Sequence, residues 1–177
     1  MADQALILTV IGDDRPGLVE ELATAISAHD GNWLEASMAH LSGKFAGIVR
    51  VAVPAERSAA LKTALTQLSG LKVSAELADA QKSAPHFPTT GRRLTLNLVG
   101  HDRIGIVKEV SQVLARHAVN VEELATHTSS APMSAEVLFH AQAELFTAPD
   151  FDARALKAEL ERLSDDLMVD ITLGETL

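Results

Sequence analysis

Two short polar turns, 12–19 and 100–107, hold the side chains best suited to chemistry in this sequence. Each turn reads Gly-x-Asp-Arg-x-Gly and runs directly into apolar residues at helical spacing. Backbone N–H groups at the start of a helix attract anions, including the carboxylate of an amino acid. The aspartate of each turn could cap that helix or bind an α-ammonium group. The last glycine leaves room for a ligand or for tight packing, so both interpretations stay open.

The sequence contains no other motif that is typical of a catalytic, metal-binding or nucleotide-binding site. The chain has no cysteine, which excludes disulfides and thiolate catalysis, and its seven histidines lack the helical spacings that bind metals. The serines lack the Gly-x-Ser-x-Gly context of a hydrolase, and no glycine-rich phosphate or dinucleotide loop occurs. We therefore predict that the protein is not an enzyme and has no catalytic residue, metal site or cofactor.

The two turns belong to an internal repeat that covers the chain. Residues 6–35 and 94–123 align without gaps at an offset of 88, with eleven identities in thirty positions. At the same offset, the alternating segment 45–53 is expected to match 133–141. A longer loop near 147–150 then shifts the next matches, so that Leu61 corresponds to Leu156 and Leu71 to Leu167. The chain is thus predicted to contain two copies of one unit.

Each copy is predicted to follow the order strand, helix, strand, strand, helix, strand. Alternating residues mark the strands, Ser42-Gly43-Lys44 marks a hairpin turn, and the second helices are expected near 56–69 and 151–164. The predicted fold class is α+β: two tandem ferredoxin-like βαββαβ domains, antiparallel sheets with helices on one face. The domains are residues 1–79 and 94–177, joined by a proline-containing linker, 80–93. One face of each sheet stays uncovered, so copies are expected to pair side by side or through their sheets.

Composition narrows the classes of partner. The formal net charge is −9, from 24 acidic and 15 basic residues, and the longest basic run is Arg92-Arg93. A DNA-binding protein normally carries a basic patch, and only 3% of residues are aromatic, which disfavours stacking on nucleic-acid bases. No leader peptide and no apolar run of membrane-spanning length is apparent. We expect a cytoplasmic protein that contacts neither nucleic acid nor membrane directly.

The Asp-Arg-Pro-Gly turn, the amphipathic helix after it and Gly31-Asn32 resemble the ACT domain family, twice over nearly the whole chain. This resemblance implies a small effector, often an amino acid, bound at an interface between paired domains. The second copy departs from the pattern, with Ile104 in place of proline and Val119 in place of glycine. The ligand-binding residues that the resemblance implies are Asp14, Arg15, Pro16, Gly17, Leu18 and Asn32, and Asp102, Arg103, Ile104, Gly105, Ile106 and Asn120.

The tandem layout is most similar to family members that repress transcription of the glycine cleavage system. That similarity implies an amino-acid-responsive negative regulator that binds a transcriptional activator protein rather than DNA. Its effector would be an amino acid such as glycine, and it would form a homo-oligomer. The alternatives are an ACT-type regulatory subunit or adaptor of an amino-acid biosynthetic enzyme, and a protein adaptor whose turn glycines serve packing alone.

Overall fold

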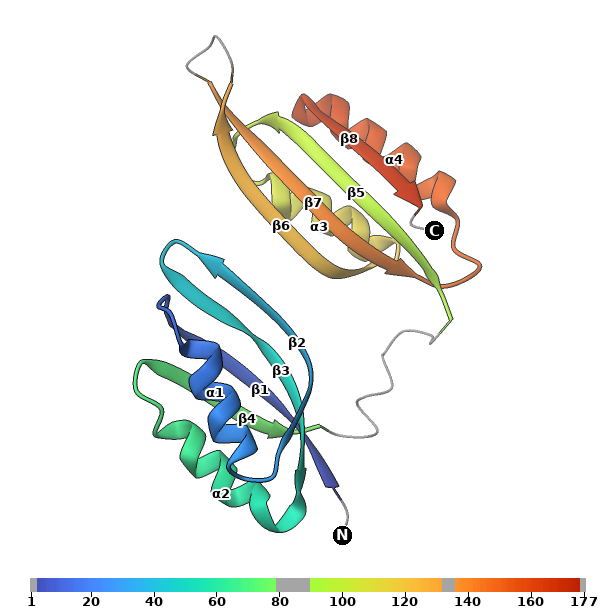
Figure 1. Cartoon of the computed structure of the whole chain (residues 1–177). Helices are drawn as coiled ribbons and strands as arrows, with labels where there is room; N and C mark the ends of the chain where they lie inside the picture. The colour runs from blue at the N-terminus through green and yellow to red at the C-terminus, as the bar shows by residue number, and fades with distance from the viewer. Residues whose placement is uncertain (1–2, 79–89, 132–135, 176–177) are drawn as a thin grey trace. The chain divides into compact units, whose positions relative to one another are not determined.

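The computed structural model describes residues 3–78, 90–131 and 136–175. The chain divides into two compact units, Met1–Ser83 and Ala84–Leu177, each with one four-stranded antiparallel sheet and two helices (Figure 1). The predicted linker, 80–93, lies largely outside the described residues, and its last two positions begin the first strand of the second unit.

The predicted order of elements is confirmed in both units. The first unit contains β1 (Asp3–Asp13), α1 (Leu18–Ser27), β2 (Asn32–Leu41), β3 (Lys44–Pro54), α2 (Ala55–Thr66) and β4 (Leu71–Leu77). The second contains β5 (Arg92–His101), α3 (Ile106–Arg116), β6 (Asn120–Ser130), β7 (Val137–Thr147), α4 (Ala153–Leu167) and β8 (Val169–Glu175). The sheet orders are β2-β3-β1-β4 and β6-β7-β5-β8, so the first strand of each unit is central.

Each core lies between one sheet face and the two helices that cover it (Figure 1). Alternate residues of a strand point to opposite faces, so Leu6, Leu8 and Val10 of β1 are buried while Thr9 is exposed. Their counterparts Leu94, Leu96 and Leu98 of β5 are buried in the same way. The other face of each sheet carries no helix of its own unit. The fold class predicted from the repeat is therefore confirmed.

Two predicted matches between the repeats are wrong. Leu6 pairs with Val51 while Leu94 pairs with Leu145, so Val51 corresponds to Leu145 rather than to Phe139. Most of the extra length of the second copy therefore falls between β6 and β7, and not near 147–150. Met133 and Ala135, which the sequence matched to β3, lie outside the described residues.

The final strands are also displaced from their predicted match. Leu71 pairs with Gly12 whereas Val169 pairs with Gly100, so Leu71 corresponds to Val169. Leu167, the predicted match, is instead the last residue of α4 and is buried in the core. The second helices likewise run over Ala55–Thr66 and Ala153–Leu167, slightly displaced from the expected 56–69 and 151–164.

Candidate functional site

The turn between β1 and α1 is fastened at both ends. The Asp14 backbone N–H donates to the Gly43 carbonyl at 2.9 Å, which ties the turn to the hairpin between β2 and β3. Gly17 has φ +93 and occupies the N-cap of α1, where no described side chain accepts a hydrogen bond from the helix. Asp14 therefore does not cap this helix, which was one of the two roles that the sequence left open for it. Its carboxylate instead lies 3.5 Å from Nε2 of His40.

Arg15 holds the turn against the start of α1. Its two terminal nitrogens donate to the two carboxylate oxygens of Glu21 at 2.7 and 2.8 Å, and one also donates to the Ser69 carbonyl at 3.2 Å. These hydrogen bonds hold the pKa of Glu21 below its ordinary range and raise the pKa of Arg15. The guanidinium thus links the β1–α1 turn, α1 and the turn before β4 in one exposed cluster.

A hollow of about 380 Å³ opens over this turn. Four predicted site residues line it, Asp14, Arg15, Gly17 and Leu18, together with Val19, Glu20 and Phe45. A Cβ atom at Gly17 would meet no atom within 4 Å, so the space next to this glycine is open. The volume lies within the usual range for small-molecule sites. The hollow therefore joins a carboxylate, a helix N-terminus and an apolar wall.

The corresponding turn of the second unit is built in the same way with looser contacts. Gly105 has φ +102 at the N-cap of α3, and again no described side chain caps the helix, so the capping alternative is excluded for Asp102 as well. Arg103 reaches Glu109 through a single contact of 3.4 Å. The Glu109 carboxylate lies 3.3 Å from the position that a side chain at Gly105 would take, and Ile104 is 100% exposed.

Asn32 and Asn120 lie far from the turns of their own domains. Asn32 pairs with Ala52, which pairs with Ala5, whereas the turn follows Asp13 at the other end of β1. Eight residues of strand separate these ends by about 25 Å. Asn120 occupies the equivalent position opposite Phe146. A single domain therefore does not bring the predicted asparagine and the predicted turn into one site.

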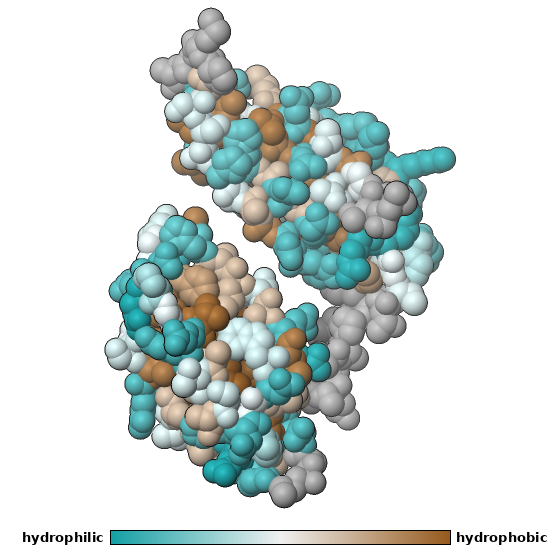
Figure 2. Space-filling view, viewed as in Figure 1, coloured by the Kyte–Doolittle hydropathy of each residue, from teal (hydrophilic) through white to brown (hydrophobic). Residues whose placement is uncertain are grey.

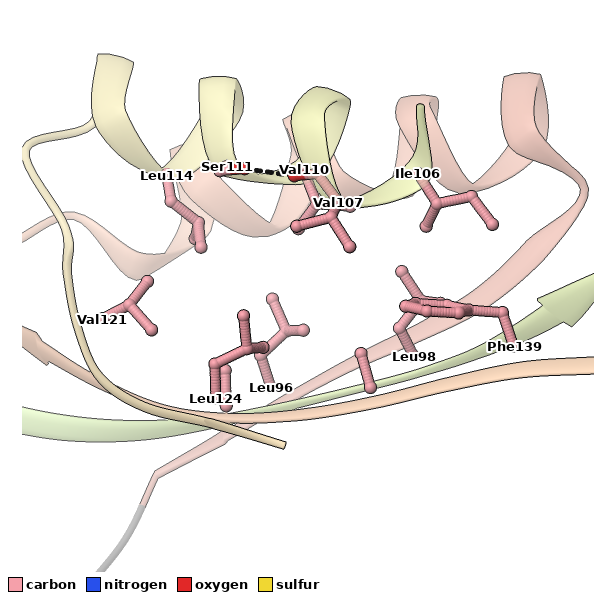
Figure 3. Close-up of a pocket in the computed structure, with 12 residues that line it drawn as sticks. Leu96, Leu98, Ile106, Val107, Val110, Ser111, Leu114, Val121, Leu124 and Phe139 are labelled. Carbon is pink, nitrogen blue, oxygen red and sulfur yellow. Dashed lines mark hydrogen bonds between the residues drawn. The ribbon is translucent and has the colours of Figure 1, made fainter. Parts of the chain in front are cut away.

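An apolar cavity of about 50 Å³ lies in the second unit between α3 and the sheet (Figure 3). Val107, Val110 and Leu114 face it from the helix, and Val121, Leu124 and Phe139 face it from β6 and β7. Ser111 also lines it, but its hydroxyl donates to the Val107 carbonyl. The charged ammonium and carboxylate of a free amino acid would find no partner there, so this cavity does not suit such a ligand.

The position of Val121 explains the cavity. In the gapless alignment of the first half of each repeat, Val121 matches Trp33, and both residues pair with the strand beside them in equivalent registers. Trp33 is half-buried and packs against the first core. The smaller valine leaves part of that space empty.

Three residues important to the turns were not predicted from the sequence. Glu21 and Glu109 are identical between the repeats and follow the turn arginines by six residues, a signal that could have indicated the ion pairs. Phe45 reaches the hollow from the start of β3 and carries no local signal, because its contact depends on the tertiary fold.

The described ranges give no sign of other site classes. Within them, no three His, Asp or Glu side chains gather as a metal site would require. Likewise, no helix in the described part of the chain has both the length and the apolar character needed to cross a membrane.

Comparison with known proteins places the chain in a family. The family model described as ACT domain matches residues 4–75 and 92–173. An unknown protein from Galdieria sulphuraria is 30% identical, with a TM-score of 0.84 over 99% of this chain and 100% of its own. A candidate glycine cleavage system transcriptional repressor has a TM-score of 0.72 and 18% identity, with 99% of both chains covered, a likeness that shows the fold alone. No curated protein sequence gives a significant match. The chain belongs to the ACT domain family, with one copy of the domain in each unit.

Proposed function

We propose that this chain is an amino-acid-responsive regulatory protein and that the first domain binds the effector at its β1–α1 turn. The observation that carries the proposal is the hollow of about 380 Å³ at the N-terminus of α1. Membership in the ACT domain family supports it, since these domains typically bind small amino-acid effectors.

The residues of the hollow suit both charged ends of an amino acid. The effector carboxylate binds the N–H groups at the start of α1, over the open space at Gly17. The Asp14 carboxylate accepts hydrogen bonds from the ammonium group, and Leu18 and Phe45 supply apolar contact. Arg15 and Pro16 keep the turn in shape, the first through Glu21 and the second through its fixed φ. Asn32 reaches the effector only from a paired domain, because it lies at the far end of its own sheet.

The second domain offers a weaker site at the corresponding turn. Asp102, Arg103, Ile104, Gly105 and Ile106, with Asn120, form the predicted second set. Here one oxygen of the Glu109 carboxylate lies 3.3 Å from the position that a Cβ atom at Gly105 would take, so it occupies the space that the effector carboxylate would enter. In the first domain both oxygens of the equivalent Glu21 are held by Arg15. We therefore assign the effector, an amino acid such as glycine, to the first domain.

The regulatory output we propose is negative control of glycine cleavage system transcription, through an activator protein in the cytoplasm. The full-length likeness to a candidate repressor of that system supports this assignment. The net charge of −9 disfavours direct binding to DNA. Effector binding changes the affinity for the activator only if the effector prefers one of two states of the protein.

Isothermal calorimetry of the full chain with proteinogenic amino acids, glycine first, tests the binding site. We expect saturable binding that Gly17→Leu abolishes and the matched Gly105→Leu leaves intact. Both glycines have positive φ, so both variants carry similar backbone strain. Gly17→Ala carries the same strain with little bulk and should retain weakened binding. Heats equal to dilution throughout the panel, or loss of binding only in Gly105→Leu, would overturn the assignment.

A transcriptional reporter for the glycine cleavage genes tests the output separately. Deletion of the gene for this chain should raise transcription, and glycine should alter co-purification of the chain with its activator. Unchanged transcription together with glycine binding would favour the alternative, a regulatory subunit or adaptor of an amino-acid biosynthetic enzyme.

A further inference from the structure

The face of the first sheet that α1 and α2 leave uncovered carries three isoleucines on its two interior strands. We call this surface the open face of the first sheet. It carries Ile7, Thr9 and Ile11 of β1, Ala46, Ile48 and Arg50 of β3, Glu35, Ser37 and Ala39 of β2, and Lys72, Ser74 and Glu76 of β4. Ile48 is 55% exposed and Ile11 is 45% exposed, although both lie on interior strands of the sheet. Such a surface normally marks an interaction site.

On β1 and β4, the side chains of this face form complementary pairs about its middle row. In that row Thr9 pairs with Ile48 on one side and Ser74 on the other. One row away lie Ile11 and Lys72, and one row away in the opposite direction lie Ile7 and Glu76. The two outer rows therefore match an isoleucine with an isoleucine, and a lysine with a glutamate.

We propose that two copies of this chain pair through the open faces of their first sheets. The twofold axis lies between the sheets and crosses the strands along the row of Thr9 and Ile48. Such an axis reverses the strand direction, so Ile7 packs on the partner's Ile11 and Ile48 packs on the partner's Ile48. The same patch serves both partners, as a closed dimer requires, and the packing is that of aligned sheets.

The charges of the face fit the same axis. Lys72 comes to lie opposite the partner's Glu76, and Glu76 opposite the partner's Lys72, which gives two ion pairs from one contact. Arg50 and Glu35 are direct cross-strand neighbours with opposite charges. Opposite these two long side chains lie the partner's Ala46 and the partner's Ala39, which leave room for them.

The open face of the second sheet lacks this pattern. We therefore do not propose it as the surface that packs on the open face of the first sheet. Its register places Thr95 where the first sheet has Ile7, Gln142 where it has Ile48, and Asp170 where it has Lys72. Packing it on the first sheet would bury polar groups against isoleucines.

Light scattering and sedimentation equilibrium of the full chain test the pairing. We expect a dimer, and we expect Ile48→Glu to raise its dissociation constant by about 100-fold or more, since it places two like charges together at the centre. The matched control is Gln142→Glu, at the equivalent position of the second sheet, which should leave the dimer unchanged. Circular dichroism checks folding, which an exposed position such as Ile48 should preserve.

Variants that reverse the charges of Lys72 and Glu76 test the position of the proposed twofold axis. Lys72→Glu and Glu76→Lys should each weaken the dimer by about tenfold, because each brings like charges together across the axis, and the double variant should restore it. A monomeric wild-type chain, or a dimer that Ile48→Glu leaves intact, would overturn the proposed surface. A double variant no tighter than the single variants would overturn the proposed axis.

Discussion

The two sheets of this protein are both apolar on the face toward the helices and differ in polarity on the other face. Toward the helices, Leu6 and Leu8 correspond to Leu94 and Leu96, and all four are buried. Toward the outside, Thr9 and Ile48 correspond to Asn97 and Gln142. The side that packs a core has stayed mostly apolar in both copies because a polar group buried there without a partner costs free energy. The open side was free to diverge, and its composition therefore reports what each domain contacts.

The open face of the second sheet is adapted to water. Figure 1 shows the strands of the second unit in front of α3, and Figure 2 shows this side mostly in the colours of polar residues. His127 and His140 stack with ring centroids 4.6 Å apart, and the Ser129 hydroxyl lies 2.7 Å from Nε2 of His140. The first sheet has Ala39 and Ala46 at the positions of these histidines. The open face of the first sheet is thus the more apolar of the two, as the proposed pairing requires.

The largest effect is expected from the residue that closes the first core. Trp33→Ala should lower the stability of the first domain by about 3 kcal/mol, because it removes an aromatic side chain packed against the core. Val121→Ala, its counterpart, should cost about 1 kcal/mol, since Val121 borders a cavity already. Amide hydrogen exchange resolved by domain measures both losses. Equal losses in the two domains would contradict the described difference in packing.

A filled cavity should strengthen the second domain. Val121→Leu adds one methylene beside the apolar cavity of about 50 Å³ and should stabilise that domain by up to about 0.8 kcal/mol. Ser111→Ala is the control, because it leaves the cavity unfilled. We expect it to change the stability of the second domain little. Hydrogen exchange, measured as the temperature is raised, compares the stability of the second domain in the two variants. A destabilised Val121→Leu variant would show that the space cannot accept a larger side chain.

A smaller, pH-dependent effect should distinguish the first turn. Arg15 holds the pKa of Glu21 below its ordinary value of 4.5 in the folded protein, so the ionised carboxylate stabilises the fold above that pH. This contribution is lost as the pH falls through the lower folded pKa. Glu21→Gln should therefore slightly destabilise the first domain at pH 7 and make no difference in strong acid. The fluorescence of Trp33, the chain's one tryptophan, follows unfolding of this domain directly.

Glu159 provides the matched case in the second domain. Hydrogen bonds from Arg116 and His117 hold the pKa of Glu159 below its ordinary range and join the end of α3 to α4. Glu159→Gln should show the same pH dependence in the second domain alone. An acid-sensitive loss in the first domain instead would mean that the domains do not unfold separately.

The sequence predicted the helices and strands well, but it matched the later strands of the two repeats wrongly. The repeat, the hairpin turn and the helical spacing depend on local residue types, and these were confirmed. The third and last strands were matched wrongly because their alternation has a period of two, so any even shift still points apolar residues inward. The mismatches of Val51 with Phe139 and of Leu71 with Leu167 are both even shifts.

The candidate site was predictable only in part. The turn residues adjoin in sequence, so their grouping in the first domain followed from the motif. Phe45 and the Ser69 carbonyl join them only through the tertiary fold. The open face of the first sheet needed the strand register as well, since Ile7, Ile11 and Ile48 become one surface only when β1 pairs with β3.

The measurement that tests the central claim most directly is hydrogen exchange of the full chain with and without saturating glycine, read at the two turns. The account predicts that glycine slows exchange at 14–21, around the start of α1, and leaves 102–109 unchanged. Protection confined to 102–109, or no protection at either turn for any amino acid, would contradict the claim that the first domain carries the effector site.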